Sequence, residues 1–582
     1  MNTTSKIKKP ILPSKLRLHG LTSHKTLLKY LPKHLSAAQI ECFLLFHKNP
    51  TQETNVRNSI RSFIKKVRHL HSLDLIQFSN FQLPENCSLK LIKTYCKIKT
   101  LSIKWDPNQY EALKFTLACL KHTHNLKILF LKGPEKHLTP NLTPKVEKIL
   151  TNIFNILQTK KLNHLKFITD VGILTDSTHL LQLDNYRKTL KELTLVWSHN
   201  KPLINEVPNL QKHLSLTHIP QLQRLELYIP IDLKTLNVIF GSIYVPTKLK
   251  SLGLIIKDET LEKKDLEGLG QLLNGSKELK KLVLKFLRWP DIFTGLECPL
   301  LERLDLQLEF KYDHNIDDLA NFLESLRHLK TLKLSMTRSF LQVESFEKNI
   351  IRLYEKVAKL NFLKVLGLNF SLGEAQKEEI LRALAKCLEG LQDLEELSLD
   401  QPELYLNYGE DYLGEILRKK TDKLKRLSIG FHQEKEKKKN NTGREEKLSR
   451  FIGLLGQMKN LENLGLRGLC LNSEEIFQKF CQAVLGLKMI RDLELKEMET
   501  PVVSGENVLR FLRKILGKRG FESLVYDESW STNPKVRYTE CEAIDLMELT
   551  KKNVQLRAIT IPSYMRMHMC FGLSINMFKW SP

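Results

Sequence analysis

The sequence predicts one curved α/β solenoid of about 18 repeats, with parallel strands on its concave face and helices on its convex face. Three observations predict this fold. A Leu-x-x-Leu-x-Leu pattern recurs along almost all of the 582 residues, successive copies are about 30 residues apart, and the stretch after each copy has helical periodicity. With 42% apolar and 27% charged residues, the chain can form a large core and a solvated surface.

Strands are expected at the leucine pattern, because alternating apolar residues suit a strand with one buried face. Clear copies stand at Leu126–Leu131, Leu301–Leu306 and Leu394–Leu399. A weaker copy is expected around Leu16 and Leu18. Taking the first apolar position of each copy, we place the repeat starts at 40, 70, 98, 126, 162, 190, 222, 249, 279, 301, 329, 363, 394, 424, 461, 490, 521 and 556.

Helices are expected between these strands. After the copy at 461, Asn472 or Ser473 can cap a helix that carries Ile476, Phe480 and Val484 on one face. After the copy at 363, the apolar face and the C-terminal stop of a helix are predicted at Ile380, Leu381, Leu384, Leu388 and Gly390. Neither a strand nor a helix can bury its apolar side alone, so the units must stack on one another.

On these motifs the sequence resembles the leucine-rich-repeat superfamily, most closely its ribonuclease-inhibitor-like branch of long repeats with a full helix in each. The resemblance implies a protein-interaction fold. The chain departs from the family in one respect, because the Asn or Cys usual three residues after the last motif leucine is mostly absent. Leu334 and Leu466 are followed by Ser-Met-Thr and Arg-Gly-Leu, so the turn after the strand must be stabilised in another way.

The repeats divide the chain into three parts. We expect residues 1–39 to form an N-terminal cap or a degenerate first repeat, residues 40–568 to form the solenoid, and residues 569–582 to form a C-terminal cap or tail. Residues 433–447, rich in Lys and Glu without an apolar anchor, are expected to be a charged loop insertion.

The compartment is predicted from cysteines and hydropathy. Ten cysteines without a Cys-x-x-Cys pair indicate neither a disulfide framework nor a zinc site. We find no signal peptide and no membrane-spanning segment, which favours a cytoplasmic protein that does not contact a membrane. Lys437–Lys439 resembles a nuclear localisation signal, although such runs are common in the loops of basic proteins.

No motif supports catalysis. The sequence lacks a phosphate-binding Gly-x-x-x-x-Gly-Lys-Ser/Thr, a His-Glu-x-x-His, a Gly-x-Ser-x-Gly and a dinucleotide fingerprint. The pairs His69/His71 and His122/His124 have a spacing that suits metal ligation poorly on either a strand or a helix. We therefore expect a protein that is not an enzyme and has no cofactor and no metal.

The positions that the leucines leave free should face the concave surface and bind a partner. Apolar side chains at these positions could form a strip bordered by lysines, with acidic residues entering from residue 301 onward. The partner-binding residues predicted in this way are Lys104, Phe130, Lys132, Lys166, Ile168, Val196, Tyr228 and Ile255. The acidic residues are Asp305, Glu396, Asp400, Asp492, Glu494 and Asp527. A register error of one residue would place the strip in the core instead.

The net charge of +26 is concentrated in the first 200 residues, which carry 32 basic and 12 acidic side chains. This favours a protein partner with an acidic surface, bound by a non-catalytic scaffold or adaptor. Two alternatives stay open: binding of an RNA or DNA backbone, and a substrate-receptor role in ubiquitin ligation as in some relatives of this repeat class. For nucleic acid, the basic patch would comprise Lys65, Lys66, Arg68, Lys93, Lys97 and Lys99.

Overall fold

The chain is known from a computed structural model, which divides it into two compact units. The first unit comprises Met1–Leu222 and Asn576–Pro582, and the second comprises Gln223–Ile575. The structure describes residues 15–19, 37–41, 72–76, 99–104, parts of 117–197, 219–231 except 220, 248–256, 263–286, 293–310, 316–338, 344–370, 378–400, 414, 417–431, 441–498 except 472, 503, 505–528 and 558–560.

The first unit contains a parallel sheet in which each strand pairs with the next one in sequence. Its strands are β1 (Lys15–His19), β2 (Ala37–Glu41), β3 (Ser72–Ile76), β4 (Thr100–Lys104), β5 (Ile128–Lys132), β6 (His164–Thr169) and β7 (Glu192–Trp197). Sequential parallel pairing of this kind needs a crossover connection after every strand.

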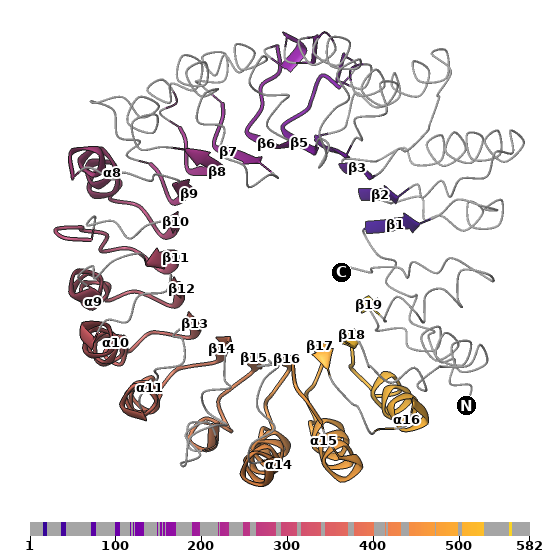
Figure 1. Cartoon of the computed structure of the whole chain (residues 1–582). Helices are drawn as coiled ribbons and strands as arrows, with labels where there is room; N and C mark the ends of the chain where they lie inside the picture. The colour runs from indigo at the N-terminus through magenta and orange to yellow at the C-terminus, as the bar shows by residue number, and fades with distance from the viewer. Residues whose placement is uncertain are drawn as a thin grey trace, which may run out of the picture. The chain divides into compact units, whose positions relative to one another are not determined.

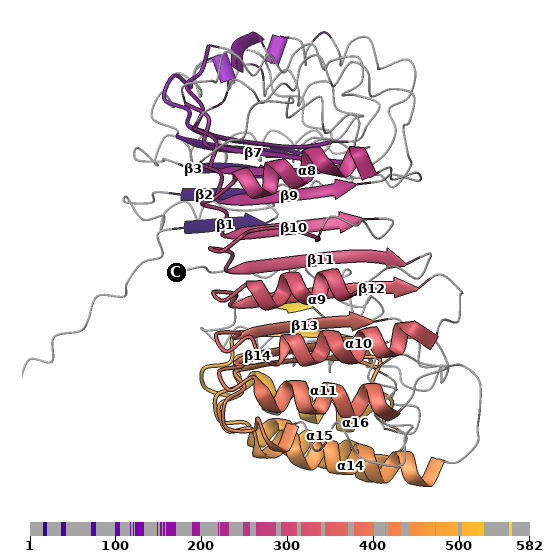
Figure 2. The same cartoon turned by 90° about the vertical axis from the view of Figure 1, so that its left-hand side faces the viewer.

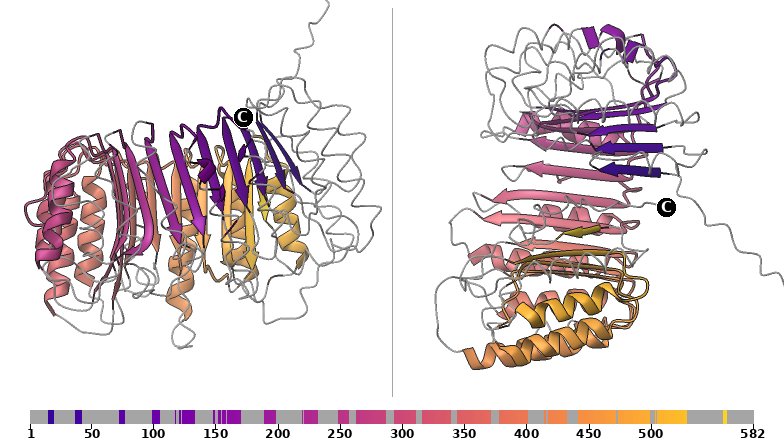
Figure 3. Two further views of the ribbon diagram at one scale, coloured as in Figure 1. Left: turned by 90° about the horizontal axis from the view of Figure 1, so that it is seen from above. Right: turned by 90° about the vertical axis from the view of Figure 1, so that its right-hand side faces the viewer.

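The second unit repeats this pairing and carries helices on one face of its sheet (Figure 1). Its strands are β8 (Arg224–Ile231), β9 (Ser251–Ile256), β10 (Lys281–Phe286), β11 (Arg303–Phe310), β12 (Thr331–Arg338), β13 (Val365–Phe370), β14 (Glu396–Asp400), β15 (Arg426–Gly430), β16 (Asn463–Arg467), β17 (Asp492–Met498), β18 (Ser523–Glu528) and β19 (Ala558–Thr560). Its helices are α8 (Lys263–Gly275), α9 (Ile316–Ser325), α10 (Glu344–Val357), α11 (Glu378–Gly390), α14 (Asn441–Gln457), α15 (Glu474–Gly486) and α16 (Gly505–Leu516). Figure 1 shows these helices following one another in chain order along the outer side of the second unit's sheet. Figures 2 and 3 show the helices lying alongside the strands in two further directions.

The predicted repeat starts are confirmed with one exception. Every start other than that at 40 lies two residues before a strand, and β1 contains the weaker copy at Leu16 and Leu18. The start at 40 is wrong, because β2 covers Ala37–Glu41. Ile40 lies in register with Leu18 and Leu75 and so takes the last apolar position of its repeat.

The predicted helical faces are confirmed in α11 and α15. In α11 the four predicted apolar residues are buried and the helix ends at Gly390. In α15 the N-cap is Ser473, whose hydroxyl accepts a hydrogen bond of 3.2 Å from the Ile476 N–H. Ile476, Phe480 and Val484 are buried against the neighbouring repeats.

The expected N-terminal cap and the expected charged insertion both contain regular secondary structure. Strand β1 lies within residues 1–39, and α14 begins at Asn441, inside the charged stretch 433–447. Residues 569–582 lie outside the described part of the chain. The roles expected for these segments as cap, insertion and tail stay predictions.

A backbone ladder fixes the start of the repeats at β5–β7 and β9–β18. The carbonyl of the residue after the first motif leucine accepts two N–H groups from the next repeat. The Glu302 carbonyl, for example, accepts from Lys330 at 2.8 Å and from Thr331 at 3.0 Å. The Glu302 carboxylate also bridges Lys280 and Lys330 at 3.0 Å each. Hydrogen bonds from these lysines lower the pKa of Glu302, but such an exposed bridge contributes little to stability. The ladder gives the repeats a fixed register without an Asn side chain after the strand.

Candidate functional site

The free face of the second unit's sheet carries the candidate site. In β14 the leucines Leu397 and Leu399 are buried, whereas Ser398 between them is exposed. The same alternation places Lys281 and Lys285 of β10 on the free face, around the buried Leu282 and Leu284. Because the described helices cover the other face (Figure 1), side chains at these alternate positions meet solvent or a partner.

In the first unit, the predicted strip occupies two rows of the sheet. Phe130 of β5 lies in register with Lys166 of β6, whereas Ile168 lies in register with Lys132 and with Val196 of β7. Phe130, Lys166, Ile168 and Val196 are all partly exposed, which agrees with a position on the free face. Their role in binding stays a prediction.

The other predicted basic residues are described only in part. Lys104 and Lys132 lie in register in β4 and β5, but the structure describes only their backbone. Lys99 is exposed at the start of β4. Lys65, Lys66, Arg68, Lys93 and Lys97 lie outside the described residues.

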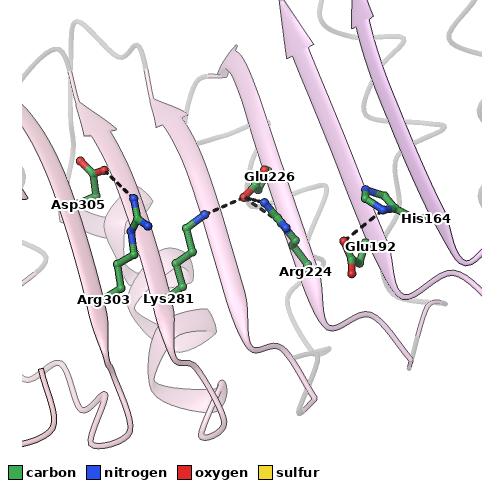
Figure 4. Close-up of polar contacts among 7 residues, drawn as sticks. All are labelled: His164, Glu192, Arg224, Glu226, Lys281, Arg303 and Asp305. Carbon is green, nitrogen blue, oxygen red and sulfur yellow. Dashed lines mark hydrogen bonds and ion pairs between the residues drawn. The ribbon is translucent and has the colours of Figure 1, made fainter. Parts of the chain in front are cut away.

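A polar contact that the sequence did not predict adjoins Phe130. His164 Nδ1 of β6 lies 3.4 Å from Glu192 Oε2 of β7 (Figure 4). The Phe130 ring meets the His164 ring edge-on, with 5.0 Å between the ring centroids. Phe130 and Glu192 thus hold the imidazole from two sides.

Tyr228 and Ile255, the predicted binding residues of the second unit, are separated by an irregularity in β8. Leu227 lies opposite Leu254, but Pro230 lies opposite Ile255, so Tyr228 falls within a bulge. Ile255 is therefore next to Pro230 in register. Both Tyr228 and Ile255 remain partly exposed.

Beside Tyr228, a buried carboxylate joins cations from two strands (Figure 4). Glu226 Oε1 accepts hydrogen bonds from Arg224 Nη2 at 2.7 Å and Nε at 3.0 Å. It also accepts one from Lys281 Nζ of β10 at 3.1 Å. The Glu226 side chain is only 7% exposed, whereas Arg224 and Lys281 are 41% and 27% exposed. The carboxylate thus anchors two cations that remain partly exposed.

Gly253 of β9 makes this arrangement possible. A Cβ at Gly253 would lie 3.0 Å from the Tyr228 hydroxyl and 3.2 Å from Glu226 Cγ. Without that Cβ, the Glu226 and Tyr228 side chains can lie over the β9 backbone, and Glu226 reaches Lys281 two strands away. Glycine inside a strand commonly marks such a close approach.

The titration of Glu226 and Tyr228 reflects this environment. Burial alone would raise the pKa of Glu226, but hydrogen bonds and charge from Arg224 and Lys281 outweigh it and lower the pKa below its ordinary value. Burial, aided by the Glu226 charge, raises the pKa of Tyr228 to about 12. At neutral pH Glu226 is therefore an ionised carboxylate and Tyr228 a neutral phenol.

Arg303 of β11 continues the row of cations formed by Arg224 and Lys281. It lies in register with Lys281, is 44% exposed, and has Asp305 Oδ2 at 3.9 Å from Nη2. The strand spacing of about 4.8 Å brings these cations close enough to contact one acidic surface. Guanidinium and ammonium groups in such a row can donate hydrogen bonds to the carboxylates of a protein.

The acidic residues predicted from residue 301 onward also lie at alternate positions of the second unit. Asp305, Glu396, Asp400 and Asp492 are partly exposed and Glu494 is exposed, while only the backbone of Asp527 is described. The described free face is therefore richer in cations at β8–β11 and richer in acids at β14–β17.

Neither a metal-binding cluster nor a membrane-spanning helix occurs among the described residues. There, no group of three or more His, Cys, Asp or Glu side chains could hold a metal ion. Of the histidines considered as ligands, His124 is exposed and the other three lie outside that part. No helix among the same residues is long and apolar enough to cross a membrane.

The parallel strands, their one-by-one pairing and the recurring leucine core decide the architecture. The fold is a leucine-rich-repeat solenoid. No protein-family model and no curated protein matches the sequence. Among solved structures, the leucine-rich repeat-containing protein LegL7 from Legionella pneumophila is similar, with 13% sequence identity, 70% of this chain and 97% of that chain covered, and a TM-score of 0.24.

Proposed function

We propose that this solenoid is a non-catalytic scaffold or adaptor that binds a protein partner on the concave face of its sheet. The supporting observation is the partly exposed row of Arg224, Lys281 and Arg303, in which Glu226 joins Arg224 to Lys281 next to the partly exposed Tyr228. An aromatic residue flanked by partly desolvated cations is the composition of an interaction hot spot. We also infer that the repeats belong near the ribonuclease-inhibitor-like branch, since their spacing is long and the described helices of the second unit are full helices.

The partner we propose has an acidic surface. The excess of 32 basic over 12 acidic side chains in residues 1–200 would accelerate its approach. Arg224, Lys281 and Arg303 in the second unit, and Lys166 in the first, would contact its carboxylates. A cytoplasmic location suits this function, with nuclear entry through Lys437–Lys439 as the alternative.

Nucleic acid is the second candidate, favoured by the same excess of basic residues. The two candidates differ in their response to salt, because contacts to many phosphates release counterions and make binding fall steeply with salt concentration. Affinity purification with and without nuclease at two salt concentrations separates them. A partner that survives nuclease and moderate salt supports the protein interface, and one lost to nuclease supports nucleic acid.

Tyr228→Ala tests the proposed interface directly. We expect this change to weaken the affinity for the purified protein partner about tenfold, which corresponds to ~1.4 kcal/mol, because the ring would be buried on binding. The affinity is measured by isothermal titration calorimetry at two salt concentrations.

Phe362→Ala is the matched control, because Phe362 is 59% exposed in the turn that precedes β13 and is not on the free face. It should bind as the wild type does. Equal affinity of Tyr228→Ala and the wild type, with a steep salt dependence in both, would contradict the protein interface and favour a phosphate backbone.

A further inference from the structure

A hollow in the second unit lies at the ends of β14–β17, away from the row of Arg224, Lys281 and Arg303. It encloses about 410 Å³. Its floor is formed by Ser398, Ser428 and Gly465, which lie in register on three consecutive strands. A neighbouring hollow of about 270 Å³ shares these three residues and Glu494, so the two hollows form one groove across the strands.

A bulge in β17 shapes one wall of this pocket. The register between β17 and β18 shifts between Leu495 and Met498, and Glu497 has a left-handed φ of 53°. Met498 is buried, so the extra residue turns Glu497 toward the free face. There, Glu497 Oε2 accepts a hydrogen bond of 3.0 Å from Arg467 Nε.

Four of the five charged side chains that line this pocket form ion pairs with each other. Arg467 pairs with Glu497, and Lys496 pairs with Glu494. Among the described residues, Asp400 has neither a hydrogen-bond nor an ion-pair partner. Its Oδ1 lies only 2.1 Å from where a Cβ of Gly430 would be, so the absence of a side chain at Gly430 leaves the space that the Asp400 carboxylate fills. The Asp400 charge also acts on Arg467, whose pKa it helps to raise. With three carboxylates and two cations, the pocket lining therefore has one more negative than positive charge.

We propose that this pocket binds a lysine or arginine side chain from an extended segment of the protein partner, with Asp400 as its counter-ion. The hollow of about 410 Å³ is large enough for such a side chain, because it is many times the roughly 30 Å³ that one water molecule occupies in the liquid. The small residues of the floor let the segment's backbone approach the sheet. A charge-assisted hydrogen bond to Asp400 would form in a partly enclosed site, where it is stronger than on an open surface. This inference deepens the proposed function, because it assigns a basic side chain to a partner whose acidic surface meets the β8–β11 row.

The test uses the full-length chain and a bead-displayed library of random dodecapeptides. The net charge of +26 attracts acidic peptides and repels basic ones, so enrichment of Lys or Arg cannot come from the overall field. We expect Lys or Arg at one position of the bound peptides to be enriched at least threefold over the input library. Asp400→Asn should remove this enrichment and weaken the best basic peptide about tenfold. Ser428→Trp, which fills the hollow from an exposed position, should do the same.

Asp393→Asn is the control, because it removes the same charge from an exposed turn before β14 and should retain the enrichment. Thermal melting of the variants establishes that each is folded. Bound peptides without Lys or Arg enrichment, or enrichment that persists in folded Asp400→Asn, would overturn this inference alone. An absence of any peptide binding by the wild type would overturn it as well, whereas the proposed function is tested separately by Tyr228→Ala.

Discussion

Gly468→Ala should lower the free energy of unfolding by about 4 kcal/mol, one of the larger losses that a single methyl group can cause. Gly468 follows β16 with φ of +69°, a conformation that costs an alanine roughly 1–2 kcal/mol. The added Cβ would also lie 1.9 Å from the Phe431 carbonyl oxygen. That backbone cannot easily move, because the Phe431 N–H donates to the Arg467 carbonyl at 2.5 Å and the Gly468 N–H donates to Lys496 at 2.8 Å. Urea denaturation measures the loss of unfolding free energy. Hydrogen exchange of the backbone amides in β15–β17 shows which strands are destabilised.

Gly295→Ala separates the conformational cost of a positive φ from the cost of the clash with the Phe431 carbonyl oxygen. Gly295 has φ of +73°, but a Cβ there would meet no atom within 4 Å. We expect this change to cost only about 1 kcal/mol, the conformational part alone. Similar losses for the two variants would show that the Phe431 carbonyl moves aside easily and that the ends of β15 and β16 are not tightly fixed.

The position of the strand in each repeat could be predicted from the sequence, because it depends on the local spacing of the leucines. The two-residue offset between motif start and strand holds through both units, since Leu-x-x-Leu-x-Leu has one arrangement that buries all three leucines. It failed at β2, where Ala38 stands in place of a leucine. The spacing therefore predicts Ile40 as the first apolar position of its repeat, whereas the strand register makes it the last.

The candidate sites were less predictable because they depend on departures from the repeat. The bulges at Tyr228 and Glu497 change which side chains are neighbours, and the leucine spacing gives no sign of either. Glu226 had no sequence signal of its own. The glycines at free positions, Gly253 and Gly430, were a usable signal, because a glycine within a strand indicates that another group approaches closely.

Glu226→Gln should lower the free energy of unfolding by about 2 kcal/mol, the second large effect we expect. The substitution keeps the side-chain shape but removes the charge that compensates Arg224 and Lys281, and hydrogen bonds to a charged group contribute roughly 1.5–3 kcal/mol each. Glu278→Gln is the control, because Glu278 is 52% exposed and lies 4.0 Å from Lys250. An exposed pair of this kind contributes roughly 0–1 kcal/mol, so this variant should be close to the wild type.

The pH dependence provides an independent readout of the same carboxylate. Because the folded-state pKa of Glu226 lies below its ordinary value of 4.5, its ionised form stabilises the fold above that pH. This stabilisation is lost as the pH falls from 4.5 through the lower folded-state pKa, where the carboxylate becomes protonated in both states. Glu226→Gln has no proton to bind, so its unfolding free energy should fall less steeply than that of the wild type in this window. Parallel acid profiles for the two proteins would mean that Arg224 and Lys281 are held without the Glu226 charge, and that the basic row is not anchored by it.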